Sequence, residues 1–374
     1  MGTALVLSFL LLIPSISTLK FLAYNPIFAR SHLNFIGSLS DSLIDAGHQV
    51  HMITPIIDSR LDLNGTTKAK MILIPQSNSS KKFENEIKSR MSRNLWFSES
   101  VADSMEEMKK MRDAWHGQCN FTLHNEGLIE MLKREKYDGA FSEPICTCGY
   151  ALFTHIGIQK YAIVLSLSSA EGSFDITGAP SFPSYIPANM GAHGERMNFF
   201  ERIQNLFNLL IPKMFLSGIR DPYNKMFSLK FGDEFPRVEE IVQKSSFYFV
   251  NSEPLIDFPK ILTNKVIDIG GISVSSGYKP LNESWSSILN QRKKNVLISF
   301  GTVAKSYLMP DEYKKSIIDA VKKFPEVTFI WKYEKPEDRI SEGIDNLIES
   351  TWVPQNDILH DTRLSLFITH CGQG

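Results

Sequence analysis

Short apolar runs alternate with longer amphipathic stretches along this chain. Between the first two runs, hydrophobic residues recur at helical spacing: Phe35, Ile36, Leu39, Leu43 and Ile44. Ser31 is suited to cap this helix and Gly47 to end it. The apolar runs themselves are typical of buried parallel strands: 19–24, 49–54, 70–74, 161–165, 247–251, 266–269, 295–300, 328–333 and 364–369. The alternation predicts βαβ units with right-handed crossovers, and hence an α/β fold.

The length and composition favour an ordinary globular protein with two domains. The chain has 374 residues, 43% hydrophobic and 22% charged, with a formal net charge of -1. Without a basic stripe, nucleic acid is not an expected partner. A Ser-rich segment at 273–292, interrupted by Gly277 and Pro280, reads as a linker, and we expect the domain boundary near Tyr278.

Residues 1–18 have the features of a secretory signal peptide. An apolar run from Ala4 to Ile13 is followed by Pro14 and small residues, and we expect cleavage near Thr18. Four N-glycosylation sequons agree with a secretory route: Asn64-Gly-Thr, Asn78-Ser-Ser, Asn120-Phe-Thr and Asn282-Glu-Ser. The four cysteines do not read as a disulfide framework, since Cys146 and Cys148 are too close to pair easily in an extended chain.

A strongly apolar stretch at 197–215 predicts another helix. A helix of this composition is usually part of a core. A cleft for a lipophilic ligand and contact with a membrane surface are the alternatives, and the sequence leaves both open. No stretch after residue 18 reaches the length of a membrane span.

The last apolar run ends in a turn that contains His370 and Gly372. In an open α/β sheet, ligands sit beyond the carboxyl ends of the strands, where a glycine turn lets backbone N–H groups approach phosphate. Trp352 offers a flat face for a base and Gln355 an amide for ribose hydroxyls. Because His370 leaves a strand end, it is placed to meet a diphosphate. Together these residues predict a nucleotide site.

A second glycine turn, Gly301-Thr302, follows the run at 295–300. Gly301 lets the backbone come close to a ligand, and Thr302 adds hydroxyl and amide donors. This combination suits phosphate. A simple strand-ending turn is the alternative.

A histidine and a carboxylate follow two strands of the first half. His32 lies in the first turn of the first predicted helix, and Glu143 ends the predicted strand 137–143. A neutral imidazole there is suited to act as a general base. A carboxylate within reach would hold its tautomer and stabilise the imidazolium. Asp138 is a second candidate for that carboxylate. A capping role for His32 and a surface position for Glu143 are the alternatives.

The run Trp-Val-Pro-Gln at 352–355, followed by Phe-Ile-Thr-His-Cys-Gly at 367–372, resembles the signature of UDP-glycosyltransferases, in particular the animal, nematode-like UDP-glucuronosyltransferase branch. The resemblance implies that Trp352 stacks on uracil, Gln355 holds the ribose and His370 contacts the diphosphate. The Ser31-His32 dipeptide matches the family's base. Glu143 stands where the family usually has Asp, and Thr302 where it usually has Ser.

The family fold is GT-B, with two Rossmann-like domains facing a cleft. The resemblance implies an acceptor-binding domain at 19–277, a linker at 278–294 and a partial UDP-sugar-binding domain at 295–374. The second domain is incomplete, because the later part of the signature, with an acidic ribose ligand and an Asp-Gln pair for the sugar, would lie beyond Gly374. The C-terminal anchor typical of the family would also lie there, and we expect membrane association only through such an anchor.

The expected function is inverting transfer of glucuronic acid or glucose from a UDP-sugar to a hydroxyl of a small lipophilic acceptor, in the lumen of the endoplasmic reticulum. His32 would be the base and Glu143 its orienting carboxylate. The UDP-sugar is a co-substrate, and no cofactor is expected. No metal is needed if helix-end amides, Thr302 and His370 offset the charge on the departing UDP, and the chain has no Asp-x-Asp motif. The alternative is a non-catalytic, UDP-sugar-binding partner of a full-length homologue, and homo- or hetero-oligomers stay open.

Overall fold

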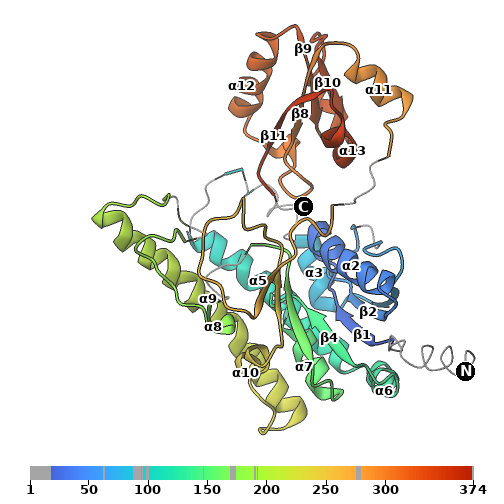
Figure 1. Cartoon of the computed structure of the whole chain (residues 1–374), viewed down its shortest axis with the longest axis vertical. Coiled ribbons are helices and arrows are strands. Elements are labelled where there is room, and N and C mark those ends of the chain that lie inside the picture. Colours follow the sequence, from blue (N-terminus) through green and yellow to red (C-terminus); the bar gives the residue numbers. More distant parts are fainter. Residues whose placement is uncertain are drawn as a thin grey trace, which may run out of the picture.

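The computed structural model describes residues 18–61, 64–86, 94, 96–97, 101–145, 147–168, 174–188, 191, 193–274 and 279–372. Nearly all of the expected signal peptide and the expected boundary near Tyr278 lie outside the described residues. The described chain forms two α/β units, which lie one above the other in Figure 1. Each unit is built on its own parallel sheet.

The lower unit contains a seven-stranded sheet in the order β3-β2-β1-β4-β5-β6-β7. Its strands are β1 Lys20–Tyr24, β2 Gln49–Pro55, β3 Lys70–Ile74, β4 Gly139–Ser142, β5 Tyr161–Leu165, β6 Tyr248–Val250 and β7 Val266–Asp268. All neighbouring strands pair in parallel. The strand order reverses between β1 and β4, so the carboxyl edge of the sheet has its switch point there.

Eight helices of the described chain belong to this unit: α2 Arg30–Asp45, α3 Asn78–Glu86, α5 Val101–Leu123, α6 Glu126–Arg134, α7 Cys148–His155, α8 Phe174–Thr177, α9 Phe199–Phe231 and α10 Val238–Gln243. The first crossover helix, α2, buries Leu33, Phe35 and Ile36. Its N-cap is Ala29, without a side-chain hydrogen bond, so the predicted cap at Ser31 is wrong. Gly47 follows the helix with a φ of +89°, as expected of a helix-ending glycine.

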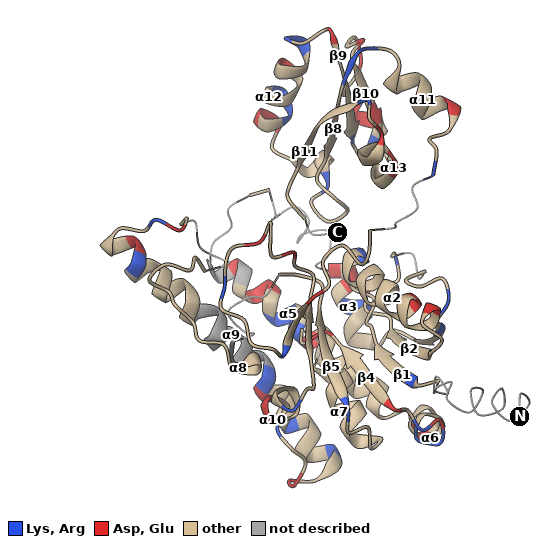
Figure 2. Ribbon diagram, in the orientation of Figure 1, with Lys and Arg blue, Asp and Glu red and all other residues tan. Residues whose placement is uncertain are grey.

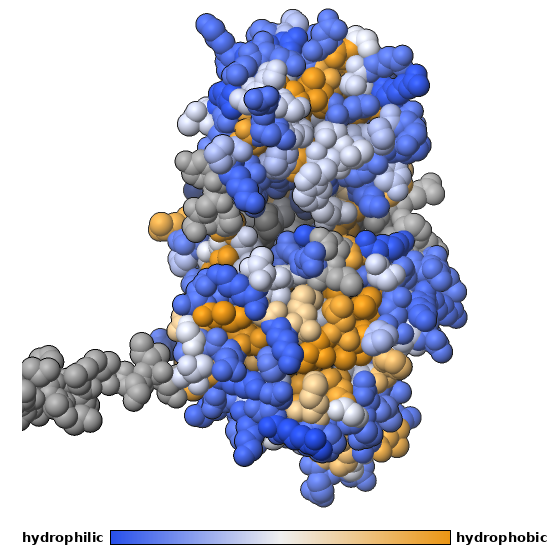
Figure 3. All heavy atoms as spheres, turned by 90° about the vertical axis from the view of Figure 1, so that its right-hand side faces the viewer, coloured by the Kyte–Doolittle hydropathy of each residue, from blue (hydrophilic) through white to orange (hydrophobic). Residues whose placement is uncertain are grey.

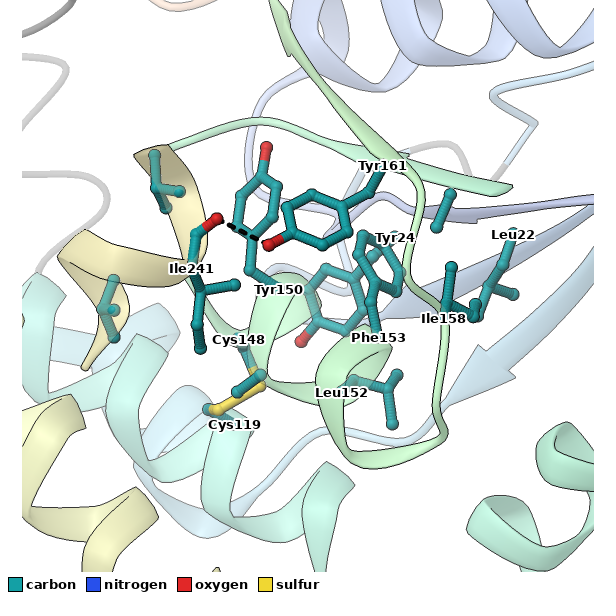
Figure 4. Packing of buried hydrophobic residues seen from close by; sticks show 14 of the residues in the cluster. Leu22, Tyr24, Cys119, Cys148, Tyr150, Leu152, Phe153, Ile158, Tyr161 and Ile241 are labelled. Carbon is teal, nitrogen blue, oxygen red and sulfur yellow. Dashed lines mark hydrogen bonds between the residues drawn. A yellow bond between two sulfur atoms is a disulfide. The ribbon is translucent and has the colours of Figure 1, made fainter. Parts of the chain in front are cut away.

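An aromatic cluster fills the space between the sheet and the helices α7 and α10 (Figure 4). Tyr150 and Tyr161 lie within it, and the Tyr161 hydroxyl donates to the carbonyl of Ile241 at 2.6 Å. Beside it, a disulfide joins Cys119 of α5 to Cys148 of α7. Our expectation that the cysteines are not a disulfide framework is therefore wrong for this pair. Packing of two helices brings together residues that are 29 positions apart in sequence, and the spacing alone does not reveal it.

Helix α9 differs from the core helix that its composition favours. In its first three turns, Asn205 is fully buried, while Phe199, Phe200 and Phe207 are exposed. Asn205 is buried because it fastens the preceding loop: its amide donates to the carbonyls of Pro183 and Ile186 and accepts from the Ala188 N–H. The first three turns of α9 therefore present apolar side chains to solvent. Among the described helices, none combines the length and apolar content required to cross a membrane.

The upper unit contains a four-stranded parallel sheet in the order β10-β9-β8-β11. Its strands are β8 Lys294–Ser299, β9 Val327–Lys332, β10 Leu347–Ser350 and β11 Leu364–Thr369. Helix α12 (Asp311–Lys322) lies on one side of the sheet, and α11 (Glu283–Leu289) and α13 (Gln355–His360) on the other (Figure 1). Two short 3-10 helices, Ser306–Leu308 and Pro336–Asp338, lie in loops. The order reverses between β8 and β11, which places a second switch point there.

The segment 278–294, which we expected to be a linker, contains α11. Asn282 caps this helix by accepting from the Trp285 N–H at 3.0 Å, and Leu289 packs with Leu297 of β8 in the upper core. This Ser-rich segment forms a helix because Asn282 caps it and Leu289 packs in the core. Its composition alone does not predict that helix.

The carboxyl edges of the two sheets face one another in Figure 1. The Trp96 side chain connects the two units: its indole donates to the carbonyl of Lys305 at 2.9 Å, and its ring meets Phe300 edge-on. Positive and negative side chains are interspersed over both units (Figure 2). Seen from the side, hydrophilic atoms cover most of the upper unit, whereas apolar atoms gather over the middle of the lower one (Figure 3).

Candidate functional site

His32 and Glu143 meet at the switch point of the lower sheet. His32 is the third residue of α2, which follows β1, and Glu143 directly follows β4. The imidazole Nδ1 lies 2.5 Å from Glu143 Oε2. Glu143 is 2% exposed, so its carboxylate is shielded from water by the protein. Because a carboxylate only accepts hydrogen bonds, Nδ1 carries the proton and Nε2 keeps a free lone pair. The pair is thus arranged as an oriented base.

The surroundings of this pair fix its geometry further. Glu143 Oε1 accepts a hydrogen bond from the Ser166 N–H at 2.9 Å, and Ser166 Oγ lies 2.9 Å from His32 Nδ1. The Phe28 ring lies 4.6 Å from the His32 ring and also contacts Trp115. One side of the imidazole is therefore covered by the Phe28 ring, which Trp115 supports.

Asp138, the second candidate for the orienting carboxylate, lies elsewhere. It precedes β4, and its carboxylate accepts from the Lys20 N–H at the start of β1, at 2.8 Å. It therefore belongs to the amino edge of the sheet, opposite His32. Asp138 caps a strand end and does not orient the base.

At the switch point of the upper sheet, His370 lies against two glycines. Gly301 follows β8 and has a φ of +76°, and Gly372 lies just beyond β11. A Cβ atom on Gly301 would lie 2.8 Å from the His370 ring, and one on Gly372 2.7 Å from it. Both positions therefore need glycine for the imidazole to occupy this place. Partial burial and the nearby charge of Lys332 lower the pKa of His370 below its usual value.

The other predicted residues of this site surround the same strand ends. Gln355 opens α13, and its side-chain oxygen accepts from the Ser299 hydroxyl at 2.9 Å. Trp352 is 65% exposed, which leaves its ring face accessible to a base. Thr302 is exposed in the loop after Gly301. The structure thus brings Gly301, Thr302, Gln355 and His370 to one edge of the upper sheet.

At the upper site, the sequence did not reveal Lys332 as a functional candidate. Lys332, the last residue of β9, is only 6% exposed, and its ammonium donates to the Gly301 carbonyl at 2.5 Å. The ammonium also lies 5.9 Å from the centre of the Trp352 ring. Its positive charge therefore lies beside the glycine turn, where it also pairs with the carboxylate of Glu334 at 3.6 Å. Its place at a strand end is the signal that could have revealed it.

The two strand-end sites can perform different chemistry. The lower one holds an oriented imidazole, and the upper one gathers glycine N–H groups, a hydroxyl and positive charge. Within the described residues, no group of three His, Cys, Asp or Glu side chains is placed to hold a metal ion. A base opposite an anion site suits the transfer of a group from a phosphate-bearing donor.

Two doubly wound sheets with facing carboxyl edges define the GT-B class of glycosyltransferases. The family model described as UDP-glucoronosyl and UDP-glucosyl transferase matches residues 26–374. The chain belongs to this family, and it is therefore a glycosyltransferase that uses a UDP-sugar.

Relatives and solved structures agree with this assignment. The Caenorhabditis elegans protein ugt-48, provisionally named a UDP-glucuronosyltransferase, is 29% identical over 98% of this chain and 70% of its own length. Human UDP-glucuronosyltransferase 1A4 is 28% identical over 72% of this chain and 49% of its own. The glycotransferase of kitacinnamycin superposes with a TM-score of 0.60 at 14% identity, covering 96% of this chain and 77% of that one. Phytolacca americana UGT2, solved with UDP-2fluoro-glucose and pterostilbene, gives a TM-score of 0.56 at 12% identity, covering 95% and 76%.

Proposed function

We propose that this chain transfers glucuronic acid or glucose, with inversion, from a UDP-sugar to a hydroxyl of a small lipophilic acceptor. The lower unit binds the acceptor and the upper unit the donor. The contact between His32 and Glu143 is the observation that carries the proposal, because it supplies a base at the switch point of a sheet whose carboxyl edge faces the donor side.

The reaction begins at the acceptor hydroxyl. His32 Nε2 takes the hydroxyl proton as the acceptor oxygen attacks the anomeric carbon of the donor. The new bond from oxygen to this carbon forms while the bond from the carbon to the diphosphate oxygen breaks, and the bonding electrons leave with UDP. Attack from the side opposite the leaving group inverts the anomeric centre. Glu143 remains ionised and stabilises the imidazolium that forms.

The upper site stabilises the departing UDP. Backbone N–H groups of the Gly301 and Gly372 turns, the Thr302 hydroxyl and His370 offset the charge that develops on the diphosphate. Lys332, held at the Gly301 carbonyl, adds a positive charge nearby. Trp352 stacks on the uracil, and Gln355 binds the ribose, with its side-chain oxygen already fixed by Ser299.

The test compares transfer and UDP binding in one protein. The parent chain is assayed with UDP-glucuronic acid and UDP-glucose against a panel of phenolic acceptors, and UDP binding is measured by calorimetry. His32→Ala should lower transfer by about 10²–10⁴-fold, the usual contribution of a general base, and leave UDP affinity unchanged. Full turnover in His32→Ala would show that His32 is not the base. UDP binding without transfer in the parent chain would favour the non-catalytic alternative.

We also propose that the chain enters the lumen of the endoplasmic reticulum. The sequence pattern at 1–18 supports this, and so does the disulfide between Cys119 and Cys148, since such bonds persist in oxidising compartments. All four sequon asparagines are exposed, and Asn78 and Asn120 lie in helices. Protein made in a secretory host should lose mass on glycosidase treatment. An unchanged mass would contradict the proposed route.

A further inference from the structure

Three neighbouring strands of the lower sheet each end in a polar residue. Glu143 directly follows β4, Ser166 follows β5 and Asn251 follows β6. These strands are adjacent in the sheet, so the three residues stand side by side along its carboxyl edge. All three are buried, with exposed fractions of 2%, 5% and 7%. Buried polar groups in a row are expected to be satisfied by one another.

Hydrogen bonds link this row to the base. The Gly271 N–H donates to Asn251 Oδ1 at 3.2 Å, and the Asn251 amide donates to the Ser166 carbonyl at 3.0 Å. The Ser166 N–H donates to Glu143 Oε1 at 2.9 Å. His32 Nδ1 then donates to Glu143 Oε2 at 2.5 Å. The bonds form one continuous chain from the loop after β7 to the imidazole.

Ser166 is the central member, because it contacts both partners of the base. Its N–H binds one carboxylate oxygen of Glu143, and its hydroxyl oxygen lies 2.9 Å from His32 Nδ1. Glu143 Oε2 only accepts and therefore favours the tautomer with a free Nε2, and Ser166 Oγ can accept from the same Nδ1 proton. Ser166 therefore bears on the geometry of the His32–Glu143 pair through two separate contacts.

The length of the Glu143 side chain explains why a second hydrogen bond to its carboxylate is needed. Glutamate has one more rotatable bond than aspartate, so its carboxylate needs a second anchor to keep a fixed direction toward His32. The Ser166 N–H supplies that anchor on the oxygen that His32 does not use. The Asn251 amide holds the Ser166 carbonyl, which belongs to the next peptide unit, and so limits movement of Ser166 from the other side of its Cα atom.

We propose that Ser166 is a positioning residue for the His32–Glu143 pair and that Asn251 supports it from the next strand. Ser166 itself touches no substrate in this role; it acts by holding the carboxylate and the imidazole in one geometry. The inference deepens the proposed function and rests on His32 being the base.

Ser166→Ala tests the hydroxyl contact directly. We expect kcat to fall about tenfold, the rate equivalent of one net hydrogen bond, with the KM for UDP-sugar and the affinity for UDP unchanged. The acidic limb of the pH–rate profile should move to lower pH, because an acceptor that stabilises the imidazolium is lost. Ser166→Thr, which keeps the hydroxyl, should recover most of the rate.

Ser40→Ala is the matched control. Ser40 is a fully buried serine on the same helix as His32, and its hydroxyl donates to the Ile36 carbonyl at 2.8 Å. Its removal perturbs a buried hydrogen bond without touching the base. We expect thermal stability to fall and the pH–rate profile to stay unchanged. An equal change in kcat and pH profile in Ser40→Ala and Ser166→Ala would overturn the positioning role.

A spectroscopic readout does not depend on turnover. In protein labelled with ¹⁵N at histidine, the His32 ring is assigned by its loss in His32→Ala. We expect a protonated Nδ1 in the parent, and a shifted or exchange-broadened Nδ1–H signal in Ser166→Ala and, more weakly, in Asn251→Ala. An identical Nδ1–H signal in the parent, Ser166→Ala and Asn251→Ala would contradict the inference. If His32→Ala instead keeps full activity, the proposed function fails, and the spectrum still decides whether Ser166 holds the ring.

Discussion

The two switch points of this molecule are built in opposite ways. In the lower sheet, Glu143 is 2% exposed, and both of its carboxylate oxygens have hydrogen-bond partners. In the upper sheet, Trp352 is 65% exposed, and Thr302 lies on an open loop. The protein thus fixes the geometry of the proposed base beforehand and leaves the ring face and hydroxyl of the proposed donor site open to solvent.

This difference fits the roles that we propose for the two sites. A general base works only in one tautomer and direction, and a buried charge-assisted pair holds both. A nucleotide supplies its own flat base, hydroxyls and charge, so a donor site can be completed by the ligand. We therefore expect changes at the lower site to alter kcat, and changes at the upper site to alter UDP binding.

Glu143→Gln should have the largest effect of the changes below. The amide can turn its NH₂ toward Nδ1, which favours the tautomer with the proton on Nε2 and blocks the base. We expect kcat to fall by about 10²–10⁴-fold, measured by UDP release, with UDP affinity preserved. The kcat of Glu143→Asp should lie between those of the parent and of Glu143→Gln, because the shorter side chain cannot reach both Ser166 and His32. A Glu143→Asp variant faster than the parent would contradict the need for the longer side chain.

Trp352→Ala should act on binding. Loss of the stacking face is expected to weaken UDP by about 1–3 kcal/mol, the worth of one base stacked on an aromatic ring. Trp352→Phe retains a ring and should recover part of the affinity. Calorimetry with UDP measures all three proteins. An unchanged dissociation constant in Trp352→Ala would exclude the stacking role, whatever happens to kcat.

The sequence predicted those parts of the molecule that depend on local pattern. Apolar runs located the strands, and the turns at Gly301 and His370 lie at the strand ends where we expected them. The choice between Glu143 and Asp138 needed the fold, because both flank β4 and only the structure shows which end of the sheet each occupies.

Other features escaped because they depend on distant segments. Ser166 and Asn251 are ordinary loop residues until adjacent strands bring them together, and Cys119 meets Cys148 only when α5 packs on α7. For helix α9, the sequence predicted more burial than the structure shows. Its apolar composition favoured a core, but the loop held by Asn205 occupies the buried side of its first three turns, so the phenylalanines of these turns face outward.

His370 predicts a pH dependence of UDP binding. Burial and Lys332 lower its pKa in the free protein, whereas a bound diphosphate raises it, because negative charge favours the imidazolium. Binding therefore takes up a proton, and UDP affinity should rise as pH falls through the range between the two pKa values. The gain is at most about tenfold for each unit by which they differ.

The measurement is UDP affinity at several pH values in the parent and in His370→Gln. The glutamine amide cannot take up a proton, so the difference in UDP affinity between the two proteins should shrink toward high pH. UDP itself also titrates, but identically for both proteins, and the comparison removes its contribution. Parallel curves over the whole range would show that His370 does not meet the diphosphate.

The smallest expected effect concerns Cys371, between His370 and Gly372. Its φ is +56°, in the left-handed region that a residue with a Cβ adopts at a cost of about 1–2 kcal/mol. Cys371→Gly should remove this strain, partly offset by the greater freedom of glycine in the unfolded chain, for a net gain of up to about 1 kcal/mol. Thermal unfolding measures the gain. Cys371→Ala is the control, because it removes the exposed thiol but keeps the Cβ. If alanine raises the melting temperature as much as glycine, then the thiol rather than the backbone limits stability, and the turn after β11 is not strained.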